Sequence, residues 1–107
     1  MFEYKVRIKA PARKKIRERA EYIALESGSK KNGQNYAKGI REFCQSLSTF
    51  PHRSIKRADL RPHLRITNYK GTSIIAYRID DKTKSVHILD VFHSAQNYEE
   101  LLNPDEA

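Results

Sequence analysis

Two apolar runs near the carboxyl end of the chain decide the fold: residues 74–80 are IIAYRID, and residues 86–93 are VHILDVFH. The charged segment DKTK separates them at residues 81–84. Two apolar runs joined by a short polar turn are typical of a β-hairpin. The second run ends at His93, and the end of a strand on a rigid scaffold is where functional side chains are usually displayed.

The segments before this hairpin predict the order β-α-α-β-β-β. Residues 2–9 alternate between apolar and charged side chains, a period of two that indicates a half-buried strand. Residues 11–28 begin with a proline, which suits the first turn of a helix, and end with a glycine, which suits a left-handed helix cap. After a polar link at residues 29–33, residues 36–50 form a second helical pattern, and Leu64–Tyr69 is the strand before the hairpin.

We therefore expect a small single domain of the α+β class covering residues 1–107, with a helical hairpin packed on a mostly antiparallel, twisted sheet. The first strand must pair with a distant one, because two helices follow it. Residues 51–63 contain two prolines and scattered cations, which predicts an ordered surface loop. Tyr98–Leu102 is expected to be a short terminal helix or strand.

The second helix carries one apolar stripe, and we expect its aromatic rings in the core. The stripe consists of Tyr36, Ile40, Phe43, Leu47 and Phe50, and the proline that follows should end the helix. Cys44, the only cysteine, is interpreted as a buried structural thiol. A single cysteine excludes an internal disulfide framework and suits a reducing cytoplasm.

The charge of the chain is large and unevenly placed. The formal net charge is +8, from 21 Lys and Arg against 13 Asp and Glu. Residues 1–20 hold eight cations and two acids, residues 51–70 hold six cations and one acid, and from Asp90 onward there are five acids and no cation. Such asymmetry favours a polyanionic or acidic partner. No apolar run approaches the ~20 residues of a membrane span, so we expect a cytoplasmic protein without a membrane partner.

The inventory of reactive side chains argues against several kinds of site. The four histidines are not spaced as metal ligands along one element, and one cysteine cannot complete a zinc site, so we expect no metal and no cofactor. The four glycines form no phosphate-binding loop, and no serine has the setting of a nucleophile on a tight elbow.

What remains is a set of cations on the predicted sheet and in the loop before it: Arg65, Arg78 and His93, with Lys56, Arg57, Arg61 and His63. Such groups could bind phosphates and stabilise the charge that develops when a 2′-hydroxyl cleaves RNA, while His93 transfers a proton. The structural alternative stays open for each: Arg78 would solvate the outer face of the sheet, and His87 would be a hydrogen-bonded, partly buried histidine on the same face as His93. Asp90 is expected to form a salt bridge or a hydrogen bond to a neighbouring strand.

Taken in order, these segments resemble the RelE/ParE superfamily of type II toxin–antitoxin toxins over nearly the whole chain. The carrying segments are YKVRI at 4–8, PARKKI at 11–16, YIA at 22–24, LSTFP at 47–51, LRI at 64–66, IAYRI at 75–79 and VHILDVFHSAQN at 86–97. The last segment resembles the ParE-type pattern ILxVxH followed by a small polar turn. One departure is Ala10, where these chains often have a capping serine, a loss of about 1 kcal/mol of stability.

The resemblance implies a toxin that a cognate antitoxin silences, within a toxin–antitoxin hetero-oligomer. The antitoxin's carboxyl-terminal segment would wrap the toxin and lay a helix or strand against the hairpin and sheet, a form of coupled folding and binding. The residues we assign to that contact are Tyr36, Ile40, Phe43 and Tyr77. The residues we assign to the target or to nucleic acid are Lys56, Arg57, Arg61, Arg65, Arg78 and His93.

Two activities follow from the two branches of the superfamily. ParE-like members bind DNA gyrase and trap its cleaved-DNA complex, with no chemistry of their own. RelE-like members are mRNA endoribonucleases that act on the ribosome without a metal, and for that activity the catalytic candidates are Arg65, Arg78 and His93. The carboxyl-terminal pattern favours the ParE branch, and Tyr98 lies where ParE-like chains have ordinary tail residues. An inactive copy that only titrates antitoxin, or a small nucleic-acid-binding domain, are the other readings.

Overall fold

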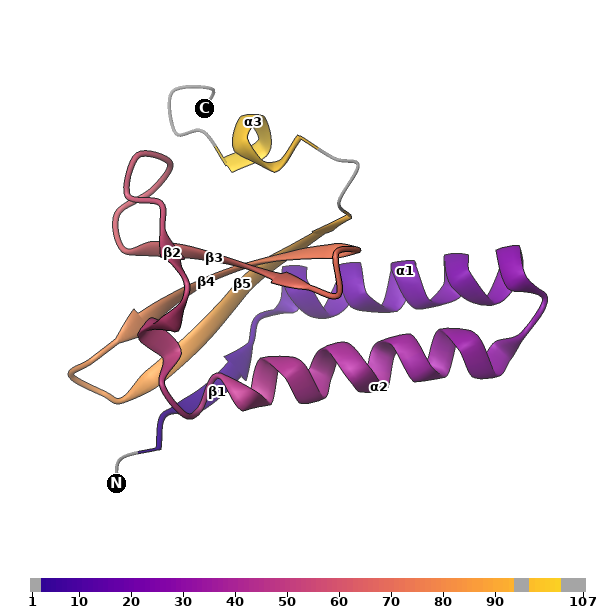
Figure 1. Ribbon diagram of the computed structural model, residues 1–107, viewed down its shortest axis with the longest axis horizontal. Helices are drawn as coiled ribbons and strands as arrows, with labels where there is room; N and C mark the ends of the chain where they lie inside the picture. The colour runs from indigo at the N-terminus through magenta and orange to yellow at the C-terminus, as the bar shows by residue number, and fades with distance from the viewer. Residues whose placement is uncertain (1–2, 94–96, 103–107) are drawn as a thin grey trace.

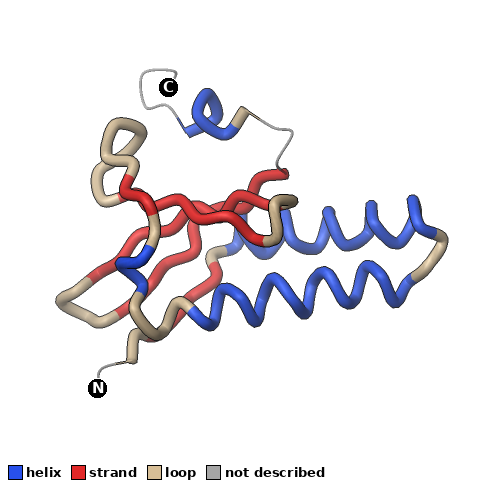
Figure 2. Tube along the Cα trace, in the orientation of Figure 1, coloured by secondary structure: helices blue, strands red, loops and turns tan. Residues whose placement is uncertain are grey.

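The computed structural model describes residues 3–93 and 97–102 and forms two layers. Its elements in chain order are β1 (Lys5–Ile8), α1 (Ala10–Ser27), α2 (Lys30–Ser46), the 3₁₀ helix η1 (Pro51–Arg53), β2 (Ile55–Lys56), β3 (Leu64–Tyr69), β4 (Ser73–Asp80), β5 (Ser85–His93) and α3 (Tyr98–Leu102). Helices α1 and α2 lie side by side, and their connected ends extend beyond the sheet (Figures 1 and 2). Phe2, predicted on the first strand, and the turn at residues 94–96 lie outside the described residues.

The five strands form one mixed sheet in the order β1-β5-β4-β3-β2. Strand β1 pairs in parallel with β5, and the other neighbouring pairs are antiparallel. This confirms the expected class and the distant partner of the first strand. Strand β2 was not predicted: it has only two residues, too few for a periodic pattern, and its pairing with β3 makes part of the predicted loop an edge of the sheet.

The hairpin of α1 and α2 is tighter than the sequence suggests. Gly28 closes α1 in the left-handed conformation, with φ of 67°, as predicted. The predicted link at 29–33 is mostly helix, because the side chain of Ser29 accepts the N–H of Asn32 at 3.3 Å and starts α2 at Lys30. Gly33 is buried against α1, where a Cβ would overlap the carbonyl oxygen of Ala20.

The end of α2 corrects one expectation about the core. The helix stops at Ser46, before the predicted boundary, and Phe50 takes a left-handed conformation with φ of 53°. The residue before a proline is pushed out of the helical region, so Phe50 cannot continue the stripe into Pro51. Its side chain is 71% exposed rather than buried.

A bulge in β5 corrects a second expectation. Ala76 pairs with Asp90 but Tyr77 pairs with Ile88, so Leu89 is an extra residue on β5. An extra residue reverses which side chains face the core beyond it. Val86 and Ile88 face the helices before the bulge, and Val91 faces them after it.

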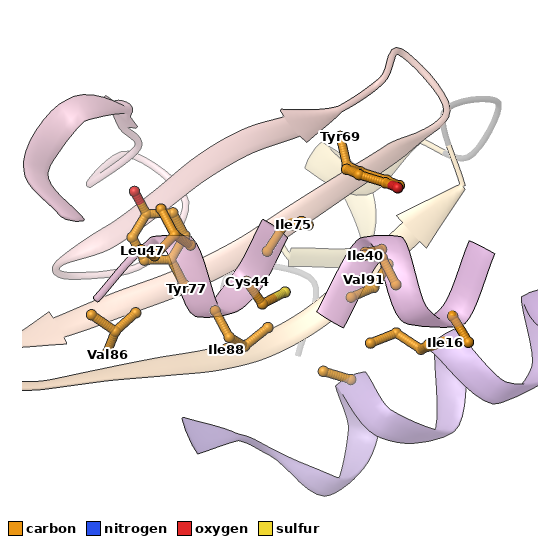
Figure 3. Close-up of a cluster of buried hydrophobic side chains, with 12 residues drawn as sticks. Ile16, Ile40, Cys44, Leu47, Tyr69, Ile75, Tyr77, Val86, Ile88 and Val91 are labelled. Atoms are coloured by element: carbon orange, nitrogen blue, oxygen red, sulfur yellow. The ribbon is translucent and has the colours of Figure 1, made fainter. Parts of the chain in front are cut away.

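The main core fills the space between the helical hairpin and the sheet (Figure 3). Its buried side chains include Ile16 of α1, Ile40 and Cys44 of α2, and Tyr77 and Ile88 of the sheet. A second apolar cluster covers the other face of the sheet, where Leu102 of α3 and Leu60 pack with Leu64, Ile66, Ala76 and Phe92. Both faces of the central strands therefore carry buried apolar side chains, while Arg78 and His87 on the second face stay partly exposed.

Replacing Gly33 by alanine tests the close approach of the two helices. We expect Gly33→Ala to lower the free energy of unfolding by about 1–3 kcal/mol, because the added methyl group forces the helices apart. Urea unfolding followed by circular dichroism measures this. Gln34→Ala, at the next and exposed position, is the matched control and should change stability little. Equal stability of the two variants would contradict the packing described.

Candidate functional site

The three candidate catalytic residues do not converge. Arg65 pairs with Tyr77 and shares its helix-facing side, whereas Arg78 pairs with Leu64 and His87 on the opposite side. His93 pairs with Ser73, five residues along β4 from Arg78, which is about 16 Å at the usual rise of a strand. The bulge also puts His87 and His93 on opposite sides, so the predicted shared face is wrong. These residues therefore cannot act on one phosphate together in this structure.

Arg65 forms hydrogen bonds that stabilise the segment around η1, between α2 and the sheet. Its Nη1 donates to the carbonyl oxygens of His52 at 3.1 Å and Ser54 at 2.9 Å. The hydroxyl of Tyr77 donates to the carbonyl oxygen of Pro51 at 2.7 Å and also hydrogen bonds Ser54 Oγ. These bonds satisfy backbone acceptors that a turn leaves open, which gives Arg65 a structural role.

His93 lines a hollow of about 330 Å³ between α1 and the end of β5. The other lining residues are Lys15, Glu18, Arg19, Tyr22, Tyr36 and Val91. Lys15 Nζ lies 3.4 Å from Asp90 Oδ1 and 4.7 Å from the centre of the Phe92 ring. Asp90 thus has the salt bridge that the sequence predicts, although its partner comes from a helix and not from a neighbouring strand. The hollow was not predicted, because it depends on the bulge that turns His93 toward α1.

The loop cations behave differently from one another. Arg57 bridges Asp59 at 2.8 Å and Glu99 of α3 at 3.2 Å, and these carboxylates raise the pKa of its guanidinium. Lys56 and Arg61 are exposed, as is His63. Arg57 therefore ties the loop to α3, while Lys56 and Arg61 are available to a macromolecular partner.

The four predicted antitoxin contacts mostly belong to the core. Ile40 and Tyr77 are fully buried, at 0% exposure, and offer no surface to a partner. Tyr36 and Phe43 are half-buried and pack against the same core, and the hydroxyl of Tyr36 hydrogen bonds Ser73 Oγ at 2.8 Å. The stripe of α2 faces the sheet, so an amphipathic pattern alone could not distinguish a binding face from a core face. Cys44 is buried as predicted, and burial raises the pKa of its thiol to about 12.

The surface of the helical hairpin carries an apolar groove that the sequence did not single out. Small side chains line it, namely Ala20, Ala24, Gly33 and Ala37, and Leu25 at its border is 84% exposed. The charged residues around it are Arg17, Glu21, Lys30 and Arg41. An exposed leucine beside a floor of small residues is a surface that another helix can fit. The signal in the sequence is Leu25, an apolar residue of α1 that is not among the core residues Ala12, Ile16 and Ala20.

The described part of the chain shows neither a metal-binding group nor a membrane-spanning helix. Over residues 3–93 and 97–102, no three His, Cys, Asp or Glu side chains gather as a metal-binding group. None of the helices in this part of the chain is long and apolar enough to cross a membrane.

The helical hairpin packed on a five-stranded mixed sheet matches the fold of solved RelE/ParE-like toxins. Residues 6–98 match the family described as the ParE toxin of the type II toxin–antitoxin system parDE. The chain belongs to this family and is a toxin of a type II toxin–antitoxin system, which confirms the superfamily that the sequence indicated.

Two solved structures show the same fold. The RelBE2 toxin–antitoxin complex from Mycobacterium tuberculosis is similar with a TM-score of 0.65 and 28% identity, over 90% of this chain and 97% of that chain. The chromosomal ParDE system from P. aeruginosa is similar with a TM-score of 0.71 and 14% identity, over 85% of this chain and 96% of that chain. No curated protein matches the chain. Both solved relatives are toxin–antitoxin assemblies, which supports a cognate antitoxin as partner.

The structural role of Arg65 can be measured. We expect Arg65→Gln to lower the free energy of unfolding by about 2 kcal/mol, because two charge-assisted hydrogen bonds to backbone carbonyls are weakened. Arg61→Gln removes the same charge from an exposed position of the neighbouring loop and should leave stability nearly unchanged. Chemical denaturation of the two variants makes the comparison, and equal midpoints would show that Arg65 does not hold the turn.

Proposed function

We propose that this toxin inhibits DNA gyrase and blocks replication until its antitoxin neutralises it. The observation that carries the proposal is the separation of Arg65, Arg78 and His93 onto different faces and ends of the sheet. General acid–base catalysis needs its groups within hydrogen-bond reach of the same reacting atoms. A protein whose candidate catalytic groups are dispersed is better suited to act by binding a target than by cleaving it, and the match to the ParE family supports the same target.

The exposed cations of the loop before β3 form the target contact in this proposal. Lys56 and Arg61 are exposed, and the same part of the chain, from the end of α2 to β3, carries two apolar side chains, Phe50 and Ile55, that are each 71% exposed. Exposed apolar patches rimmed by polar residues mark interaction sites, where aromatic side chains and arginine are enriched. Gyrase acts in the cytoplasm, so the toxin would work there as well.

A gyrase assay tests this proposal. Purified toxin should inhibit supercoiling at low micromolar concentration and should increase the yield of cleaved-DNA complexes. The double variant Lys56→Glu, Arg61→Glu should lose at least tenfold in potency, because two favourable charges at the contact become repulsive. A variant of the same charge at Lys30 and Arg41, on the helical hairpin, should keep its potency. No inhibition by the unaltered toxin would remove gyrase as the target.

The alternative target is the translating ribosome. The 28% identity to the RelBE2 complex favours this second candidate, since that relative carries the RelE name. His93 in its hollow beside Lys15 would then be the proton-transferring group, with its cations supplied by α1 and not by the strands. In the absence of gyrase inhibition, cleavage of mRNA in a purified translation system that His93→Ala abolishes would establish this activity.

We propose the groove of the helical hairpin as the antitoxin site, in place of the buried residues of the α2 stripe. Three of the four charged residues around the groove are basic: Arg17, Lys30 and Arg41. The complementary partner is an amphipathic helix with acidic flanks, whose small or aliphatic side chains enter the groove beside Leu25. Antitoxin bound here would form the expected hetero-oligomer.

Leu25 tests the antitoxin site without disturbing the core. We expect Leu25→Asp to weaken binding of the antitoxin from the neighbouring reading frame by at least tenfold, because a charge would be buried in the apolar contact. Titration calorimetry measures the affinity, and co-expression measures the loss of neutralisation. Ile55→Asp is the matched control, because that residue is similarly exposed but lies on the sheet edge. Unchanged affinity of Leu25→Asp would place the antitoxin elsewhere.

A further inference from the structure

A row of cationic side chains crosses three neighbouring strands on the face of the sheet opposite the helices. Arg7 of β1 pairs with His87 of β5, and His87 pairs with Arg78 of β4. Residues paired directly across strands lie on the same face, about 4.5–5.5 Å apart. A residue adjacent to each of these three points to the opposite face: Val6, Val86 and Ile79 pack against the main core under the helices.

This arrangement is unfavourable for a protein that binds nothing there. Arg7 and Arg78 flank His87 from its two neighbouring strands, and burial and their positive charges oppose protonation of its imidazole. Asp80 is a carboxylate whose charge acts on His87; its Oδ1 accepts the N–H groups of Thr83 at 3.2 Å and Lys82 at 3.0 Å, and these bonds and the charge of Arg78 lower its pKa. The Nδ1 atom of His87 is buried and has no hydrogen-bond partner among the described residues. A bound anion would neutralise the positive charges of this row and accept hydrogen bonds from its side chains.

The pKa of His87 is also affected by these neighbouring cations. Partial burial lowers the pKa of His87, and the charges of Arg78, Lys9 and Arg7 lower it further, against the opposing effect of Asp80. These groups come from every strand that flanks the histidine. A bound anion would favour the protonated imidazole and would raise this pKa.

The spacing of cations along the edge strand β1 is close to the spacing of phosphates along a nucleic acid strand. Lys5 and Arg7 are exposed and two residues apart on β1, so they lie about 6.6 Å from one another on the same face. That interval is close to the spacing of successive phosphates on one nucleic acid strand. Contacts from such side chains to phosphates position a nucleic acid but carry no sequence information.

We infer that the face formed by Lys5, Arg7, Lys9, His87 and Arg78 binds the phosphate backbone of a nucleic acid without sequence preference. The bound phosphates accept hydrogen bonds from the arginines and lysines and relieve the repulsion along the row. This face lies on the side of the sheet away from the antitoxin groove, and the inference does not depend on which target the toxin has.

Binding is tested with the purified chain and fluorescein-labelled probes: a short single strand of DNA, the RNA of the same sequence, and the corresponding DNA duplex. We expect sequence-independent binding that weakens with salt. The variant Arg7→Gln, Arg78→Gln should weaken it at least threefold and make the slope of log affinity against log salt less steep by ~0.7–0.9 per lost contact. The matched control Arg13→Gln, Lys14→Gln removes the same charge from exposed positions of α1. Equal losses in the two variants would overturn the site, because binding would then follow net charge alone.

A second measurement reports on this face directly. Proton NMR of the imidazole rings, with His87 assigned from the His87→Gln variant, should show the pKa of His87 rising when the favoured probe is added. The three probes distinguish RNA from DNA and single strands from duplex as the preferred form. Binding of the probes with no change in the His87 titration, or tighter binding of a glutamate-rich peptide of equal charge, would overturn the proposal. Neither readout uses gyrase or toxicity, so this inference and the proposed function can fail independently.

Discussion

The extra residue in β5 is the constraint on which the rest of the site geometry depends. Strand β5 lies between β1 and β4, and it is the only strand that pairs in parallel with one neighbour and antiparallel with the other among the described elements. Without the bulge at Leu89, one set of alternate residues would face the helices along the whole strand. With the bulge, Val86 and Ile88 pack in the main core before Leu89, and Val91 packs there after it. Phe92 packs in the second cluster on the other face. The strand can therefore supply both cores.

The architecture was predictable because its signals are local. The alternation in β1, the proline and glycine that bound α1, and the hairpin of β4 and β5 each depend on residues close together in the chain, and each formed as predicted. What the sequence could not show was how β5 is divided between two cores. Apolar side chains occur in both alternating sets of residues from Val86 to Phe92, so no strict period of two marks the extra residue. The same limit applies to Phe50, whose place in the helical stripe was overruled by the backbone restriction that Pro51 imposes.

The candidate site was less predictable because charged residues serve several purposes on a basic protein. The sequence does not distinguish the roles of its arginines. Arg65 holds a turn by hydrogen bonds to backbone carbonyls, and Arg57 links the loop to α3 through Glu99. Arg78 instead lies beside His87 in the basic row on the sheet. The distinction depends on which carbonyl or carboxylate each one meets. In the same way, the buried Ile40 and the exposed Leu25 are both aliphatic residues in amphipathic helices, and only the packing of α2 on the sheet separates core from binding surface.

The separation of the proposed surfaces has a consequence for neutralisation. The antitoxin groove lies on the helical hairpin, whereas the cationic row lies on the sheet face that the hairpin leaves open. The two surfaces lie on opposite sides of the sheet, and exposed charges separated by more than about 8 Å are largely screened at physiological salt. Acidic residues bound in the groove therefore cannot cancel the field of the row from a distance. An antitoxin that silences both surfaces must reach around the sheet, and one confined to the hairpin would leave the complex able to hold nucleic acid.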